Sequence, residues 1–165
     1  EISACLVGSE MCIRDSMCIV NLEKYVNKDS TVFDIGCGSG ILGIVAAKLG
    51  AKDVVGIDID AVAVKVAKEN ISKNGVDKVM VAMEGNLADD MDKDKKADIV
   101  VANIIADIIV ILAKDVKNFL KEGGIFISSG IILAKIDEVV ASLEENGFEL
   151  VSVEKKGEWA CVIAR

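Results

Sequence analysis

The sequence predicts a doubly wound α/β fold whose seven-stranded, mostly parallel sheet ends in an antiparallel hairpin. From residue 17 onward, short runs rich in β-branched residues alternate with helical patterns, as in parallel strands joined by crossover helices. The strand runs are almost continuously apolar, which is typical of a sheet covered by helices on both faces. The last two strand runs have no helical pattern between them. They must therefore pair as a hairpin.

The elements can be placed in chain order. Five runs are expected to form the parallel strands: TVFDI (31–35), DVVGID (53–58), KVMVAM (78–83), ADIVVAN (97–103) and GIFISS (124–129). Helices are expected at about residues 17–27, 41–49, 61–73, 105–121 and 132–146. The hairpin consists of FELVSVEKK and EWACVIAR, with a turn around Gly157. Ligands of open parallel sheets bind at the carboxyl ends of strands where the strand order reverses, so we expect a site after the first strand.

The composition argues against several functions. A chain of 165 residues, 52% of them hydrophobic, has the size of one domain and can bury a core. Its net charge is -8 and no segment concentrates basic residues, so direct binding to nucleic acid is not expected. Charged residues interrupt every apolar run, so we expect no membrane span and a soluble, cytoplasmic protein. The five cysteines include no CxxC pair and histidine is absent, so we expect free thiols and no metal site.

The first residues, EISACLVGSEMCIRDS, differ from the rest of the chain. They show no helical or strand period, and they lack the basic start and long apolar core of a signal peptide. The string resembles a peptide that arises when sequencing-adaptor DNA is translated. We expect a non-native or disordered head over residues 1–16 and one folded domain over residues 17–165.

The glycine-rich stretch FDIGCGSGILG, residues 33–43, fits two cofactor motifs. Its last part, GSGILG, satisfies the dinucleotide fingerprint G-x-G-x-x-G, and Asp58 follows at a suitable distance to accept a ribose hydroxyl. The same stretch also reads D-x-G-x-G-x-G from Asp34 to Gly40. The two frames place the tight turn two residues apart. NAD(P) and S-adenosyl-L-methionine are therefore both candidate cofactors.

Asp34 favours the second frame because it ends the first strand with a negative charge near the ligand. A pyrophosphate beside it would be repelled by about 1 kcal/mol or more. S-adenosyl-L-methionine carries an ammonium and a sulfonium, and its carboxylate suits exposed backbone N–H groups. In this frame Gly36, Gly38 and Gly40 keep the backbone clear of the ligand and free to take positive φ. Gly43 then allows the following helix to approach the sheet.

Two further strand ends carry candidate cofactor ligands. The two carboxylate oxygens of Asp58 can accept both ribose hydroxyls of either cofactor, whereas Asp60 is expected only to cap the helix that begins at Ala61. Asn86 lies in MEGNL at the end of the third strand, within expected reach of an adenine. An ordinary solvated turn explains that segment equally well.

Asn103 ends the fourth strand, where apolar neighbours would bury its amide and leave it in need of partners. Its carbonyl could accept from an amine nucleophile and aim the amine's lone pair at a methyl group, while apolar surroundings favour the neutral, reactive amine. The sequence therefore makes Asn103 the candidate catalytic residue. The alternative is an asparagine that caps the following helix.

Four segments together resemble the catalytic domain of the ribosomal protein L11 methyltransferase family: FDIGCGSGILGIVAAKLGAKDVVGIDID, VVANIIADII, GGIFISSGII and GFELVSVEKKGEWACVIAR. The resemblance covers residues 17–165 and implies the Rossmann-like class I methyltransferase fold. It also implies transfer of a methyl group from S-adenosyl-L-methionine to amino groups of ribosomal protein L11, by direct in-line displacement.

Carried over position by position, the resemblance assigns the same residues as the chemical argument. It makes Gly36, Gly38 and Gly40 the cofactor loop and Asp34 a neighbour of the methionine moiety. Asp58 then binds the ribose and Asn103 lies at the methyl-transfer site.

The chain also departs from the family. The family has a loop of the type G-T-G-T-H-P-T-T before the first helix, where this chain has EISACLVGSEMCIRDS. The family also has a separate amino-terminal domain that grips the ribosomal protein. We therefore expect a truncated catalytic fragment. A cofactor-binding domain without catalysis and an NAD(P)-binding oxidoreductase domain are the alternatives.

Overall fold

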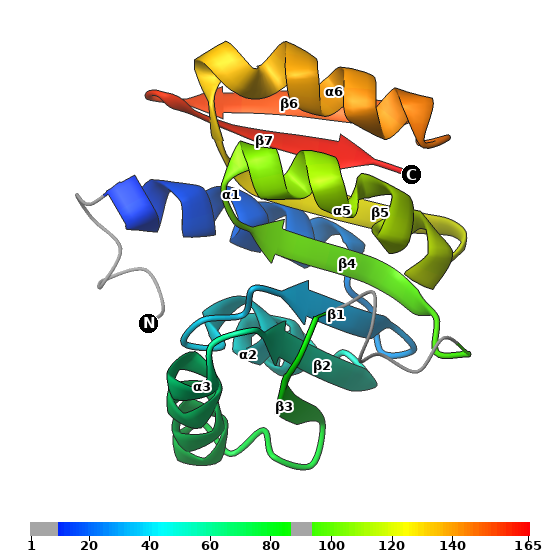
Figure 1. The fold of residues 1–165 in the computed structure, drawn as a ribbon. Helices are drawn as coiled ribbons and strands as arrows, with labels where there is room; N and C mark the ends of the chain where they lie inside the picture. The colour runs from blue at the N-terminus through cyan, green and yellow to red at the C-terminus, as the bar shows by residue number, and fades with distance from the viewer. Residues whose placement is uncertain (1–9, 87–93) are drawn as a thin grey trace.

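The computed structural model describes residues 10–86 and 94–165. The strands of these ranges form one seven-stranded sheet in the order β3-β2-β1-β4-β5-β7-β6 (Figure 1). They are β1 (Thr31–Ile35), β2 (Asp53–Asp58), β3 (Met80–Glu84), β4 (Ala97–Asn103), β5 (Leu120–Ile132), β6 (Leu150–Lys156) and β7 (Trp159–Ala164). Strands β3, β2, β1, β4 and β5 run parallel, whereas β7 pairs antiparallel with both β5 and β6. The predicted fold class is confirmed, including its final hairpin.

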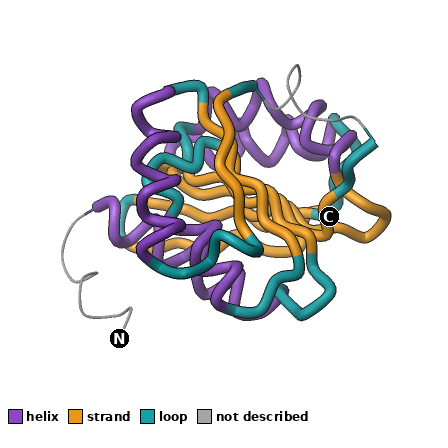
Figure 2. The backbone as a smooth tube through the Cα atoms, turned by 90° about the horizontal axis from the view of Figure 1, so that it is seen from below, coloured by secondary structure: helices purple, strands orange, loops and turns teal. Residues whose placement is uncertain are grey.

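Helices cover both faces of the sheet, as the tube view shows (Figure 2). One face carries α1 (Glu10–Tyr25), α2 (Ile41–Lys48) and α3 (Ala61–Lys73), and the other carries α5 (Ala106–Phe119) and α6 (Ile136–Glu145). The short 3-10 helix η2 (Leu133–Lys135) leads into α6. Within the described ranges, no helix has both the length and the apolar character needed to cross a membrane.

Successive side chains of each strand point to opposite faces of the sheet, which produces one hydrophobic core on each face. Val32 of β1 and Val101 of β4 pack with α1, α2 and α3, whereas Phe33 and Val100 pack with α5 and α6. All four side chains are fully buried. Because successive side chains of a strand point to opposite faces, a strand covered on both faces is apolar throughout. This explains the continuous apolar runs of the sequence.

Two elements begin earlier than the sequence predicts. Helix α1 begins at Glu10 rather than at residue 17, so residues 10–16 are helical, and Ile13 among them packs against the core. Strand β5 begins at Leu120 because this residue pairs with Ala97 across a bulge in the register. Both extensions depend on contacts with distant strands or the core, which local periodicity does not reveal.

The chain order of the strands reverses at β1, which pairs with β2 on one side and with β4 on the other. Because the three strands are parallel, their carboxyl ends lie at the same edge of the sheet. The glycine-rich stretch follows β1 at this edge. The topology thus places it where open α/β sheets bind ligands.

The predicted packing role of Gly43 is confirmed. A Cβ at this position would overlap Met80 Cε of β3 and would lie 3.2 Å from Asp34 Oδ2. Met80 is only 1% exposed, so its thioether has little room to move away. The absence of a side chain at residue 43 allows α2 to lie close to the sheet.

We predict that Gly43→Ala destabilises the protein by about 1–3 kcal/mol, as overpacking of a core does. In an open helix position the same change would stabilise by about 1 kcal/mol, so the sign of the effect tests the packing. Urea unfolding of both proteins measures it. In a Met80→Ala background the substitution should cost less, because the overlapping atom is gone. Stabilisation by Gly43→Ala in the wild-type background would contradict the close approach.

Candidate functional site

The loop between β1 and α2 is built on glycines with positive φ. Gly36, Gly38 and Gly40 have φ of 65°, 53° and 82°, values that side-chain-bearing residues rarely adopt. The N–H groups of Gly36 and Cys37 donate to the Ile57 carbonyl oxygen at 2.8 and 3.0 Å, which fastens the loop to β2. A Cβ on Gly38 would meet no atom within 4 Å. The loop therefore presents open space at its middle glycine.

Asp34 lies under this loop as a buried acid. Its side chain is 1% exposed and its Oδ2 accepts from the Gly43 N–H at 2.9 Å. This bond satisfies one N–H of the first turn of α2, whose N-cap, Gly40, has no side chain to do so. Burial is the main cause that raises the pKa of Asp34 to about 7. The Asp15 and Asp58 charges raise this pKa further, and the Gly43 N–H acts in the opposite direction.

Asp58 ends β2 beside the loop, and two backbone donors fix its carboxylate. Its Oδ2 accepts from the Gly38 N–H at 2.9 Å and its Oδ1 from the Asp60 N–H at 3.0 Å. Each carboxylate oxygen has a second lone pair, so both oxygens can still accept a ligand hydroxyl. Asp60 accepts from the Val62 N–H at 2.8 Å and is the N-cap of α3, which confirms its predicted role.

Asn86 follows β3 at the same edge. Asp58 and Glu84 are paired across β2 and β3, and the Gly85 N–H donates to the Asp58 carbonyl oxygen at 3.0 Å. Asn86 is exposed two residues beyond Glu84. Its predicted role at an adenine stays a prediction, and Leu87, the last residue of that segment, lies outside the described ranges.

Asn103 ends β4 next to the loop, since a Cβ on Gly36 would lie 2.6 Å from Cγ2 of the adjacent Ile104. Its Nδ2 donates to Asp15 Oδ1 at 2.5 Å. Its Oδ1 is buried and has no hydrogen-bond partner in the described part of the chain. The N-cap of α5 is Ile105, without a side-chain cap, so the alternative role of Asn103 as a helix cap is wrong.

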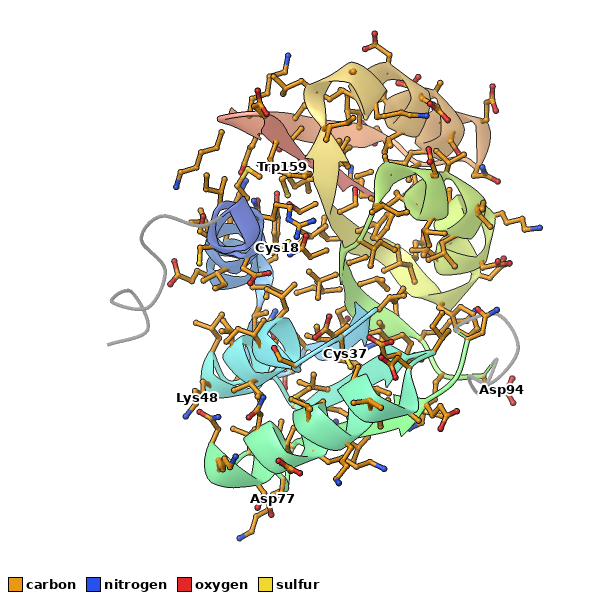
Figure 3. All side chains as sticks on the ribbon, turned by 60° about the vertical axis from the view of Figure 1, so that its left-hand side comes forward. Cys18, Cys37, Lys48, Asp77, Asp94 and Trp159 are labelled. Atoms are coloured by element: carbon orange, nitrogen blue, oxygen red, sulfur yellow. The ribbon has the colours of Figure 1, made fainter. Side chains whose placement is uncertain are left out.

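The first turns of α1 join the site, which the sequence did not predict. Besides Asp15, the Arg14 carbonyl accepts from Ser129 Oγ at 3.3 Å, and the Arg14 guanidinium stacks over Trp159 at 4.8 Å from the ring centroid. Trp159 lies beside α1 in Figure 3. Burial is the main cause that raises the pKa of Asp15, against its bond to Asn103 and the charge of Arg14. Ser129 pairs with Asn103 across β4 and β5 and is the last residue of the strand run GIFISS in the sequence, a signal that could have identified it.

Cys37 lies inside the loop but is not a reactive thiol. It is 5% exposed and packs against Gly56 of β2. Burial is the main cause that raises its pKa to about 12, with the Asp34 and Asp58 charges adding to it. The thiolate form that reacts with oxidants and electrophiles is therefore scarce at neutral pH. Cys18, Cys37 and Cys161 form no disulfide within the described ranges, in line with the prediction for these three.

The charges and the unpartnered acceptor of the site suit a cationic ligand and an N–H donor. Three carboxylates, Asp15, Asp34 and Asp58, lie close enough for the charges of two of them to raise the pKa of the third. A cationic ligand would relieve that repulsion. The Asp58 oxygens can accept hydroxyls, and the unpartnered Asn103 Oδ1 can accept an N–H. These residues fit S-adenosyl-L-methionine, which combines a cationic amino-acid part with a ribose.

Comparisons with known proteins agree with this geometry. The family model described as ribosomal protein L11 methyltransferase (PrmA) matches residues 15–165. Relatives of that name from Alkaliphilus oremlandii and Clostridium perfringens are 58% and 59% identical over 149 residues. Each match covers 90% of this chain and 47% of the relative. The chain thus spans about half the length of the curated relatives it matches.

Solved structures give the same result. A ribosomal protein L11 methylase from Lactobacillus delbrueckii subsp. bulgaricus superposes with a TM-score of 0.86 at 31% identity, covering 93% of this chain and 79% of that one. A TehB-like SAM-dependent methyltransferase from Corynebacterium glutamicum shares the fold, with a TM-score of 0.72 at 16% identity over 92% of this chain and 87% of that one. These matches, together with the sheet order and the glycine loop, show that the chain belongs to the ribosomal protein L11 methyltransferase family.

Proposed function

We propose that this chain is the catalytic part of an enzyme that transfers a methyl group from S-adenosyl-L-methionine to amino groups of ribosomal protein L11. The observation that carries the proposal is the buried, unpartnered Oδ1 of Asn103 beside the glycine loop. A buried polar atom without a partner is rare and needs an explanation. An incoming amine provides one, because its N–H would satisfy this oxygen.

Each residue of the site has one task in this proposal. Gly36, Gly38 and Gly40 let the backbone pass close to the cofactor, and Asp58 accepts its ribose hydroxyls. Asp34 faces its ammonium group, and Asn86 lies near its adenine. When bound, S-adenosyl-L-methionine supplies a methyl group on a positively charged sulfur. Asn103 accepts an N–H of the substrate amine and so aims the nitrogen lone pair.

We also propose the domain boundary at residue 17, with residues 1–16 as a non-native or disordered head; residues 10–16 are helical and extend α1, so for them only the non-native alternative remains. The family match begins at residue 15, which supports a boundary close to this point. The names of the relatives support ribosomal protein L11 as the protein substrate. An enzyme that acts on a ribosomal protein would be located in the cytoplasm.

Calorimetry tests the cofactor. S-adenosyl-L-methionine and S-adenosylhomocysteine should bind the purified chain, and NAD should not. Asp58→Ala should weaken both sulfur ligands by about 10- to 100-fold, because it removes the hydroxyl acceptors and the partner of the Gly38 N–H. Asp60→Ala is the matched control: it removes a helix cap, at a cost of about 1 kcal/mol in stability, and should leave affinity unchanged. Binding of NAD alone would favour the oxidoreductase alternative.

The affinity for S-adenosyl-L-methionine should rise with pH between 5.5 and 7.5. The pKa of Asp34 is raised to about 7 in the free protein, so at lower pH the ligand's ammonium must displace a proton from this carboxyl. The expected slope is up to about tenfold per pH unit. Asp34→Asn should remove this dependence while leaving any titration of the ligand's own amine in place. An equal slope in both proteins would exclude Asp34 as the titrating group.

The same raised pKa has a consequence for stability. The folded state binds the Asp34 proton more tightly than the unfolded state does. The free energy of unfolding should therefore fall as pH rises from about 4 to about 7, and the penalty is fully present above that range. Urea unfolding at several pH values should show a flatter profile for Asp34→Asn. A profile of unchanged steepness would contradict the assignment.

Methyl transfer itself is measured with a labelled methyl group and purified ribosomal protein L11. Asn103→Ala should lower kcat by about 100-fold, since misplacing a reactant costs about this much, and leave the Kd of the cofactor within about threefold. Asn146→Ala is the matched control, because this residue lies at the carboxyl end of α6 and donates only within its own helix. Cofactor binding without any transfer by the wild type would favour the non-catalytic alternative.

A further inference from the structure

Strand β5 contains an extra residue close to the site. Its antiparallel pairing with β7 shifts there, and the pairs on either side of the shift are Ser128 with Val162 and Ile131 with Ala160. Three steps along β5 therefore match two steps along β7, which is the pattern of a β-bulge. Gly130 lies inside this bulge with a φ of 83°, a conformation that favours glycine. The bulge thus depends on Gly130.

The bulge also changes which face of the sheet the end of β5 presents to each core. Phe126 and Ile131 pack in the same core although they are five positions apart. In a regular strand, residues an odd number of positions apart point to opposite faces. This packing explains why β5 has a bulge. It does not explain what the bulge contacts on its other side, where β4 ends.

Gly130 lies directly against the end of β4. A Cβ on Gly130 would overlap the Ile104 carbonyl oxygen and would lie 3.1 Å from Asn103 Oδ1. The Ile104 N–H donates to the Ser129 carbonyl oxygen at 3.2 Å, and Ser129 pairs with Asn103. The overlapping atom belongs to the backbone, so it cannot turn aside as a flexible side chain can. A side chain at residue 130 would therefore displace the end of the strand that carries Asn103.

A second glycine contacts the same residue of β4. A Cβ on Gly36 of the cofactor loop would lie 2.6 Å from Ile104 Cγ2. Ile104 thus packs against a glycine through its side chain and against another glycine, Gly130, through its carbonyl group. Both contacts are closer than any residue with a Cβ would allow. Together they determine how far the end of β4 lies from the glycine loop.

We propose that Gly130 is a positioning residue for methyl transfer: because it has no side chain, the end of β4 can lie against the bulge of β5, which sets the position of Asn103 relative to the glycine loop. The inference rests on the proposed function, in which Asn103 orients the amine in front of the cofactor. A misplacement of about 1 Å can cost about 100-fold in rate. A side chain at residue 130 should therefore reduce the rate of transfer far more than it reduces binding.

Amide hydrogen exchange, followed by nuclear magnetic resonance, tests the contact without cofactor or substrate. In Gly130→Ala the Ile104 N–H should exchange at least about tenfold faster, relative to the amides of β1, than in the wild type. Gly123→Ala is the matched control, because Gly123 also lies in β5 with a φ of 72° and a Cβ on it would meet no atom within 4 Å. It should leave the exchange ratio unchanged. An equal ratio in the wild type and Gly130→Ala would overturn the proposal.

Kinetics with ribosomal protein L11 supplies the second readout. Gly130→Ala should lower kcat by about 100-fold and leave the KM for L11 and the Kd for S-adenosyl-L-methionine within about threefold. Gly123→Ala should leave all three constants within the same limit. In an Asn103→Ala background, Gly130→Ala should cause little further loss of kcat, because it acts through Asn103. Losses that multiply in the double variant, or an unchanged kcat of Gly130→Ala, would overturn the proposal.

Circular dichroism shows whether the variants fold. If alanine prevents folding, Gly130→Asn takes its place, because asparagine tolerates positive φ better and still sets a Cβ against the Ile104 carbonyl oxygen. Failure of both variants to fold would make Gly130 a requirement of the fold alone and would overturn the proposal. A wild type that binds cofactor but transfers nothing contradicts the proposed function instead, and the exchange ratio still shows whether Gly130 positions the end of β4.

Discussion

The site depends on one hydrogen bond, from the Gly43 N–H to the buried carboxylate of Asp34. It joins the fourth residue of β1 to the third residue of α2, and the glycine loop is the segment between them. The bond can form because Gly43 has no side chain and α2 lies against Met80 of β3. Close packing of a helix on a sheet thus sets the shape of the glycine loop.

The second constraint is electrostatic. Asp34 is 1% exposed and lies near the charges of Asp15 and Asp58. Burying like charges together is unfavourable; the Arg14 guanidinium lowers the pKa of Asp15, whereas no cation is among the causes that shift the pKa of Asp34. A cationic cofactor would offset this repulsion on binding. Without a ligand, the folded protein is therefore less stable than it would be with uncharged side chains at these positions. Such a cost is expected at a binding site.

The side-chain oxygen of Asn103 could determine which group reacts with the cofactor. In the proposed function the glycine loop and Asp58 bind the cofactor, and they do not determine what reacts with it. The unpartnered Oδ1 of Asn103 adds an acceptor at the next strand end, beside Ile104 and the loop. A site with a cation-binding half and an acceptor half can bring a cofactor and an amine together. Orientation of this kind is a large part of what an enzyme contributes to a displacement reaction.

Much of this arrangement could be predicted from the sequence because it is local. Asp58 and Asn103 end apolar strand runs, Asp34 is the last residue but one of another, and parallel strands bring such ends to one edge. Gly43 was recognisable by its spacing in the glycine stretch. Which strands are neighbours follows from topology, and the order β2-β1-β4 is the one that gathers these residues.

Other features could not be predicted because they depend on distant contacts. Asp15 reaches Asn103 across 88 positions from a segment without periodicity. The early start of β5 depends on the pairing of Leu120 with Ala97 across a bulge. The missing partner of Asn103 Oδ1 also depends on tertiary structure, since α1 takes the NH₂ group while no donor of the described residues reaches the buried oxygen.

A crystal structure of this chain with S-adenosylhomocysteine would show where the cofactor lies. We expect the ribose hydroxyls on the Asp58 carboxylate, the amino-acid part along the loop from Gly36 to Gly40, and the sulfur directed toward Asn103. A ligand bound elsewhere on the molecule, or a ribose held without Asp58, would mean that the carboxyl ends of β1, β2 and β4 do not form the cofactor site.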